Sequence, residues 1–200
     1  MEAENRPLRA DARRNRDRLL HVARQAFAAE GLSVSLDDIA RRAGVGAGTL
    51  YRHFPTKEAL FEAVVHERLR ALVDQARALG SADDPGAALF EILHRIVADA
   101  AAKSDLVDAL AGAGIEVRTT VAATSAELRR EVSRLLARAQ AAGTVRGDID
   151  IADLMVVLGG VLLALRHPAN KGADPGRALA ILLDGLRAAP RDQGLSGGSC

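Results

Sequence analysis

The stretch from Gly46 to Lys57 combines very small residues with hydrogen-bonding side chains. The small residues are Gly46, Ala47 and Gly48, and the hydrogen-bonding side chains that follow are Thr49, Tyr51, Arg52 and His53. On a helix these polar side chains are exposed while Leu50 and Phe54 point inward. A helix with a small first turn and a polar exposed face fits the major groove of DNA, where it meets phosphates and base edges. The spacing therefore predicts a DNA-contacting helix over residues 47–53.

The residues before this helix predict the elements that would position it. Ser35-Leu36-Asp37-Asp38 has the form of a capping box, in which the serine hydroxyl and the last carboxylate each accept a backbone amide. A short helix follows, and Gly44 suits the left-handed turn that would end it. Pro55 stops the second helix, and Thr56 can cap the next one. We therefore predict a helix-turn-helix over residues 35–54.

The composition favours an all-α fold. The 200 residues are 48% hydrophobic and 26% charged, with no Trp, one Tyr and four Phe, and we find no convincing strand candidate and no internal repeat. The net charge is +1, but residues 1–60 hold eleven Arg and Lys against eight acidic residues, a balance of +3. The positive charge is thus concentrated in the first third of the chain, although Arg-rich solvated helix faces are common.

Nothing in the sequence indicates catalysis or a bound metal or cofactor. Five scattered histidines form no metal-binding motif, no phosphate loop occurs, and the lone cysteine is Cys200. The first ten residues lack the apolar core of a signal peptide. The most apolar stretch, Leu154–Leu165, is shorter than the roughly 20 residues that span a bilayer. We expect a cytoplasmic protein that has no membrane partner.

The chain divides into four predicted segments. These are a flexible basic arm (1–10), a three-helix domain with the predicted helix-turn-helix (11–56), an all-helical domain (57–189) and a disordered tail (190–200). The helices expected in the large domain are 57–79, one that Pro85 opens, a weak one at 105–111, 117–142, 150–167 and 174–189.

Residues 13–65 resemble the DNA-binding domain of TetR-type regulators. The matching pieces are Ala26-Phe27 with Gly31, Leu36-Asp37-Asp38-Ile39-Ala40, Ala43-Gly44-Val45, Gly48-Thr49-Leu50-Tyr51-Arg52-His53-Phe54 and Lys57-Glu58-Ala59-Leu60. The resemblance covers the first third of the chain strongly. The rest is similar only in its helical pattern and its length, as the variable ligand and dimer domain of that family would be.

The resemblance implies roles for individual residues. Thr49, Tyr51, His53 and Lys57 match positions that hold DNA phosphates, and Ser35 lies at a helix N-terminus that also suits an anion. Arg41, Gly46 and Ala47 occupy positions that reach base edges, and Gly48 allows a close backbone approach. Many relatives have Ser where this chain has Gly46, so one cap and one contact are missing. Tyr51 and Arg41 also fit a plain surface role, as do Arg9, Arg13 and Arg14 of the arm, which could otherwise enter a minor groove.

The resemblance also implies a homodimer. Residues 150–167 are apolar nearly all round and contain Gly159-Gly160, which would let another helix approach closely. With residues 174–189 they would form a four-helix interface, and a twofold dimer matches a palindromic DNA operator. The alternative is that both helices are buried within one monomer.

The leading hypothesis is a ligand-responsive repressor whose small-molecule effector shifts the helix at 57–79. The polar residues that lie near apolar faces are His66, His94, Arg118, Arg166 and His167, each of which also fits a structural role. Because aromatic residues are scarce, an aliphatic or modestly polar effector is expected. The alternatives are an all-α enzyme or carrier, and an architectural DNA binder without an effector.

Overall fold

The computed structural model describes residues 5–101, 119–167, 170 and 172–188. Within these ranges the chain is helical throughout, apart from turns and one isolated bridge between Val145 and Arg187. The elements are α1 (Asn5–Glu30), η1 (Gly31–Ser33), α2 (Leu36–Arg42), α3 (Ala47–His53), α4 (Lys57–Leu79), α5 (Pro85–Ala101), α7 (Thr119–Ala141), α8 (Ile151–Arg166) and α9 (Pro175–Leu186). The all-α prediction is confirmed.

Two predicted boundaries are wrong. Helix α1 begins at Asn5 and not at Asp11, so residues 5–10 of the expected flexible arm are helical. Pro7 does not prevent this, because proline is tolerated in the first turn of a helix. Helix α9 ends at Leu186, since the extended Arg187 pairs with Val145. The expected weak helix at 105–111, Arg118 and the tail from residue 190 lie outside the described residues.

The first hydrophobic core joins α1, α2, α3 and the start of α4. Its fully buried side chains include Leu19, Phe27, Ile39, Leu50 and Leu60. The rings of Phe27 in α1 and Phe61 in α4 meet edge to face, with their centroids 5.7 Å apart. This contact is of the favourable T-shaped kind, and it fastens the longest helix of the small domain to α4.

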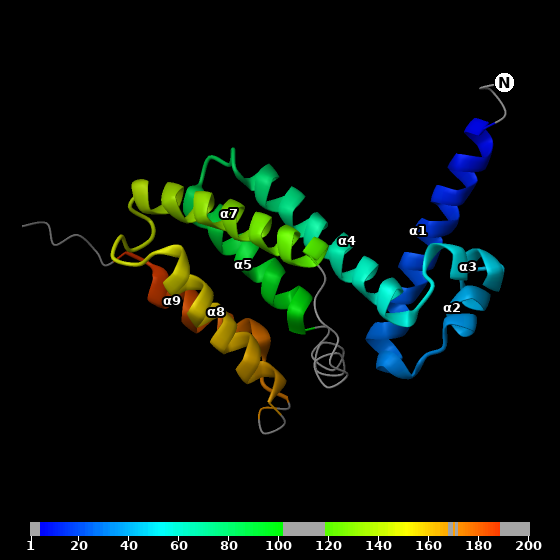
Figure 1. Cartoon of the computed structure of the whole chain (residues 1–200). Coiled ribbons are helices and arrows are strands. Elements are labelled where there is room, and N and C mark those ends of the chain that lie inside the picture. The colour runs from blue at the N-terminus through cyan, green and yellow to red at the C-terminus, as the bar shows by residue number, and fades with distance from the viewer. Residues whose placement is uncertain (1–4, 102–118, 168–169, 171, 189–200) are drawn as a thin grey trace, which may run out of the picture.

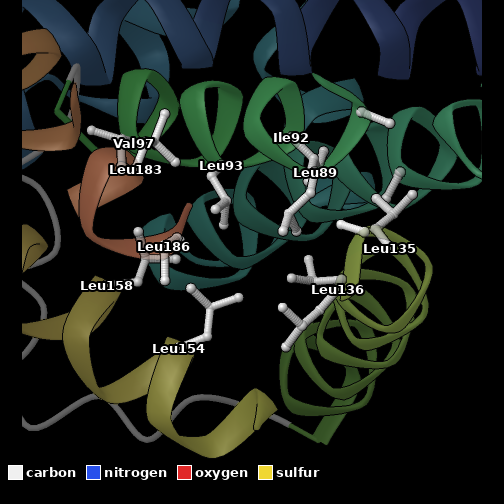
Figure 2. Close-up of a cluster of buried hydrophobic side chains, with 14 of the residues drawn as sticks. Leu89, Ile92, Leu93, Val97, Leu135, Leu136, Leu154, Leu158, Leu183 and Leu186 are labelled. Carbon is white, nitrogen blue, oxygen red and sulfur yellow. The ribbon is translucent and has the colours of Figure 1, made fainter. Parts of the chain in front are cut away.

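The second core lies among α4, α5, α7, α8 and α9 and is built largely of leucine (Figure 2). Leu89, Ile92 and Leu93 of α5 are fully buried at its centre. Leu135 and Leu154 approach them from α7 and α8. Aliphatic side chains thus make up the buried part of this core, and the aromatic residue Phe90 packs against its edge.

Helix α4 belongs to both cores. Leu60 and Val64 are buried in the first, while Leu72 and Val73 are buried in the second. Figure 1 shows α4 running from the group formed by α1, α2 and α3 to the larger helical group. One continuous helix therefore sets how the two parts of the chain are placed relative to each other.

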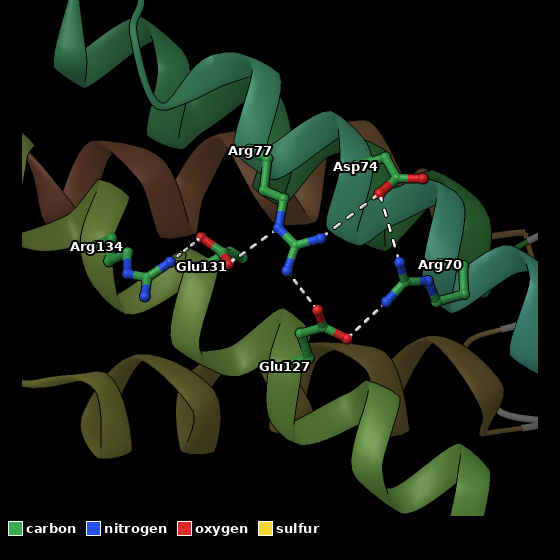
Figure 3. A network of polar contacts seen from close by, with 6 residues as sticks. All are labelled: Arg70, Asp74, Arg77, Glu127, Glu131 and Arg134. Atoms are coloured by element: carbon green, nitrogen blue, oxygen red, sulfur yellow. Dashed lines mark hydrogen bonds and ion pairs between the residues drawn. The ribbon is translucent and has the colours of Figure 1, made fainter.

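A network of charged side chains joins α4 to α7 (Figure 3). Arg77 donates to Glu127 and Glu131, Arg70 donates to Glu127 across 2.7 Å, and Arg134 contacts Glu131 across 2.8 Å. Hydrogen bonds to Glu127 and Glu131 raise the pKa of Arg77. Burial acts to raise the pKa of Glu127, but the contacts with Arg77 and Arg70 outweigh it and hold that pKa below its usual value. Each charge is matched, so α4 and α7 are held in register as well as packed.

Candidate nucleic-acid interface

The turn between α2 and α3 has the geometry that the sequence predicts. The Ser35 side chain accepts the Asp38 amide at 3.1 Å, and Gly44 adopts φ +64°, the left-handed conformation that favours glycine. The amide of Val45 then donates to the carbonyl of Ala40 at 3.0 Å. The reciprocal half of the capping box is not found among the described contacts of Asp38, whose carboxylate pairs with Arg41 and Arg42 instead.

Helix α3 is held from below by two buried side chains. Leu50 is fully buried and Phe54 nearly so, as the sequence predicts. The guanidinium of Arg16 in α1 lies over the Phe54 ring, 5.6 Å from its centroid. The buried side chains on the inner side and the stacking at the C-terminal end together determine which face of α3 points outward.

The residues expected to contact DNA lie along this outward face and next to it. Gly46, Ala47, Gly48 and Tyr51 are exposed on α3 or its cap, Thr49, His53 and Lys57 are half-buried, and Ser35 and Arg41 are exposed on α2 or its cap. No side chain caps α3, because its N-cap residue is Gly46. A Cβ added at Gly46 or Gly48 would meet no atom within 4 Å. The start of α3 is therefore open to a close partner.

Tyr51 is tied to α2 by a contact that sequence reasoning missed. The negative charge of Asp37, with partial desolvation and a hydrogen bond to the same carboxylate, raises the pKa of Tyr51. The contact crosses from one helix to the next, so no local spacing signals it. The charge of Asp37 on α2 thus acts on the phenol of α3.

Two arginines, Arg52 and Arg41, contribute to the charge of this surface. Arg52 donates through Nη2 to the Thr49 hydroxyl at 3.0 Å and through Nε to the Gly48 carbonyl at 3.3 Å. The hydrogen bond between Arg52 and Thr49 is predictable from spacing alone, because residues three positions apart on one helix are neighbours. Arg41, whose side chain is 74% exposed, pairs with Asp38 along α2. Arg52 therefore adds a cation beside the predicted phosphate contacts.

The described residues show neither of two other site types. None of their helices is long and apolar enough to cross a membrane. No group of three or more His, Cys, Asp or Glu residues in the part of the chain that the structure describes is placed to hold a metal ion.

Comparison with known families matches both parts of the chain. Residues 19–64 match "Bacterial regulatory proteins, tetR family", and residues 84–188 match "Transcriptional regulator SbtR-like, C-terminal domain". The two matches cover the helix-turn-helix and most of the second core.

Solved structures are similar along nearly the whole chain. A TetR transcription regulatory protein from Mycobacterium vanbaalenii is 48% identical, with a TM-score of 0.72 over 91% of this chain and 100% of that one. A TetR transcriptional regulator from Streptomyces coelicolor is 35% identical, with a TM-score of 0.71 over 88% and 99%. An HTH-type transcriptional regulator of Staphylococcus aureus is 39% identical over 69 residues, 34% of this chain. This match spans 37% of the regulator's length, so the chain covers about a third of the curated relatives that it matches.

Titration of the phenol tests the contact between Asp37 and Tyr51. Tyr51 is the only tyrosine of the chain, so ultraviolet difference absorbance reports it alone. We expect a pKa above the ordinary value of about 10, and a lower one in Asp37→Asn, because the variant removes the nearby negative charge. Asp83→Asn, at an exposed loop position, is the control. The same pKa in Asp37→Asn and in the unchanged chain would show that Asp37 does not act on Tyr51.

Proposed function

The chain belongs to the TetR family of bacterial transcriptional regulators, and from this membership we propose that it is a ligand-responsive repressor that binds a palindromic DNA operator as a homodimer. The observation that carries the proposal is the outward face of α3. It begins with three small residues, bears hydrogen-bond donors and is anchored from below by Leu50 and Phe54. Such a helix suits insertion into the major groove.

Phosphates would bind at the rim of this face. Thr49, Tyr51 and His53 of α3 and Lys57 at the start of α4 offer hydroxyl, imidazole and ammonium groups to them. The Thr49 hydroxyl already accepts a hydrogen bond from Arg52, so this side chain is oriented before DNA arrives. Orientation in advance lowers the entropy that binding would cost.

Base edges would be contacted by fewer groups. Gly46 and Ala47 offer backbone and little side chain, which leaves Arg41 as the long donor among the proposed base contacts. To reach a base, its guanidinium must leave Asp38; the energetic cost of this is small because the guanidinium is exposed and Asp38 keeps its ion pair with Arg42. We therefore assign sequence preference mainly to Arg41 and affinity mainly to the phosphate contacts.

The proposed dimer would form through α8 and α9. Four large apolar side chains are exposed there: Val156 (74%), Val157 (51%), Leu163 (70%) and Ile181 (68%). A Cβ at Gly159 or Gly160 would meet nothing within 4 Å, so the middle of α8 can accept a helix at close range. Exposed apolar residues on adjacent helices favour a protein interface.

The family match favours a regulator over the all-α enzyme considered at first. An architectural DNA binder would use the same helix-turn-helix without an effector. The second core favours the effector-responsive alternative, because the shared helix α4 gives a change in that core a direct route to α3. An effector acts in this way when it binds the conformation with α4 in one position more tightly than the conformation with α4 in another.

The DNA proposal is tested by mobility shift on the DNA upstream of the chain's own coding sequence. We expect a salt-sensitive complex that is tighter than the complex with shuffled DNA of the same composition. Tyr51→Ala should weaken binding to both DNAs by about fivefold, because it removes one phosphate contact. Arg41→Ala should reduce the preference for the upstream DNA by about fivefold or more, because it removes a base contact.

Arg130→Ala is the control, since this exposed arginine lies on α7. The repressor proposal fails if no sequence-preferring complex forms. The division of roles fails if Arg41→Ala and Tyr51→Ala weaken binding to both DNAs equally.

The dimer proposal is tested by sedimentation of Leu163→Glu and Ile181→Glu. Each variant places like charges on the two copies in a desolvated interface, so the dimer dissociation constant should rise at least about a hundredfold. Ala137→Glu, an exposed small-to-charged change on α7, should have no effect. If neither Leu163→Glu on α8 nor Ile181→Glu on α9 changes the dimer dissociation constant, the interface lies elsewhere.

A further inference from the structure

A cavity lies at the junction between the two cores. It has a volume of about 460 Å³, within the usual range of small-molecule sites. Helix α1 contributes Arg24, and the other walls come from α4 and α5. The cavity therefore touches the DNA-binding domain and the second domain at once.

The walls of the cavity carry more positive than negative groups. The positive residues are Arg24, Arg68 and Arg95, and the negative ones are Glu67 and Asp99. Arg95 also contacts Glu91 through Nε at 2.7 Å, and Arg24 contacts His21 at 3.1 Å. Each of these contacts engages one nitrogen of a guanidinium that has several donors.

Arg68 has one donor that is not satisfied. Its Nε donates to Asp99 Oδ1 at 2.9 Å, and its Nη2 contacts the same carboxylate and the Asp99 carbonyl. Its Nη1 is buried and has no hydrogen-bond partner among the described residues. A buried charged donor without an acceptor is costly, so an anion that accepts from it would gain a strong hydrogen bond.

The remaining lining is mostly aliphatic. Ala71 and Leu72 of α4 and Ala98 of α5 line the cavity together with the amide side chain of Gln75, and no aromatic ring is among the lining residues. Such a wall suits an alkyl chain better than a flat ring. Of the polar candidates named from the sequence, His66, His94 and His167 are not among the residues that line the cavity, and the side chain of Arg166 lies outside the described part of the structure.

We propose that this cavity binds a small aliphatic carboxylate, held by Arg24 and Arg68, and that this ligand is the effector of the repressor. The effector role rests on the proposed function, whereas the site itself stands on the cavity and its arginines. For its carboxylate to reach the buried Nη1, the walls must move apart slightly. Occupancy then changes the spacing of α1 and α4 and disfavours the DNA-competent arrangement.

Calorimetry with hexanoate and its neutral counterpart hexanamide tests the site on the full chain. We expect hexanoate to bind with a dissociation constant of about 1 mM or lower and hexanamide at least about tenfold more weakly, because the amide lacks the charge. Arg24→Gln and Arg68→Gln should each weaken hexanoate binding at least about tenfold. Arg130→Gln, on the exposed surface of α7, is the matched control and should leave binding unchanged.

Arg24 is exposed, so its variant keeps the test valid even if Arg68→Gln disturbs folding. The site is wrong if hexanoate does not bind, or if it binds Arg24→Gln as tightly as the unchanged chain.

Mobility shift with and without saturating hexanoate tests the effector role, and we expect hexanoate to weaken the DNA complex at least about fivefold. An unaffected complex would overturn that role. If DNA binds but hexanoate does not, only the cavity proposal fails. If hexanoate binds through the arginines but no DNA complex forms, the repressor proposal fails and the site stands.

Discussion

Helix α4 buries its first turns in the core that supports α3 and its later turns in the leucine-rich core of the second domain. Packed side chains resist continuous deformation. A displacement of α4 in one core therefore also moves the part of α4 that lies in the other core. The position of α3 relative to the α8 and α9 faces follows from this one constraint. In the proposed dimer, the separation of the two DNA-contacting helices follows from it as well.

Charged contacts hold the C-terminal end and the middle of α4 differently. Near its C-terminal end, Arg77 is matched by Glu127 and Glu131 of α7. Near its middle, Arg68 is matched by Asp99 of α5 but keeps one buried donor without a partner. The charges around Arg77 are matched and favour one register of α4 against α7. Arg68, in contrast, would be stabilised by a new hydrogen-bond acceptor. The junction is therefore the part of α4 where a ligand can act.

The sequence predicted the local features of the site and missed those made between helices. The Ser35 and Thr56 caps and the left-handed Gly44 were predictable because each depends on a few neighbouring residues. The contact of Asp37 with Tyr51, the stacking of Arg16 on Phe54 and the α4–α7 network were not, because they depend on how helices cross. The cavity could not be predicted from the sequence for the same reason, because its arginines come from three helices.

Native-state hydrogen exchange along α4 tests the shared helix most directly. The stretch at 65–71 joins the two buried segments, and within it Val65 packs against the first core and Leu69 against the second. If α4 is one rigid connection, the amides of this stretch should be protected to the same degree as those of residues 60–64 and 72–76. Exchange in the middle stretch that is about a hundredfold faster than in both flanks would reveal a hinge. That result would contradict the account of α4 as the element that fixes α3 relative to the second domain.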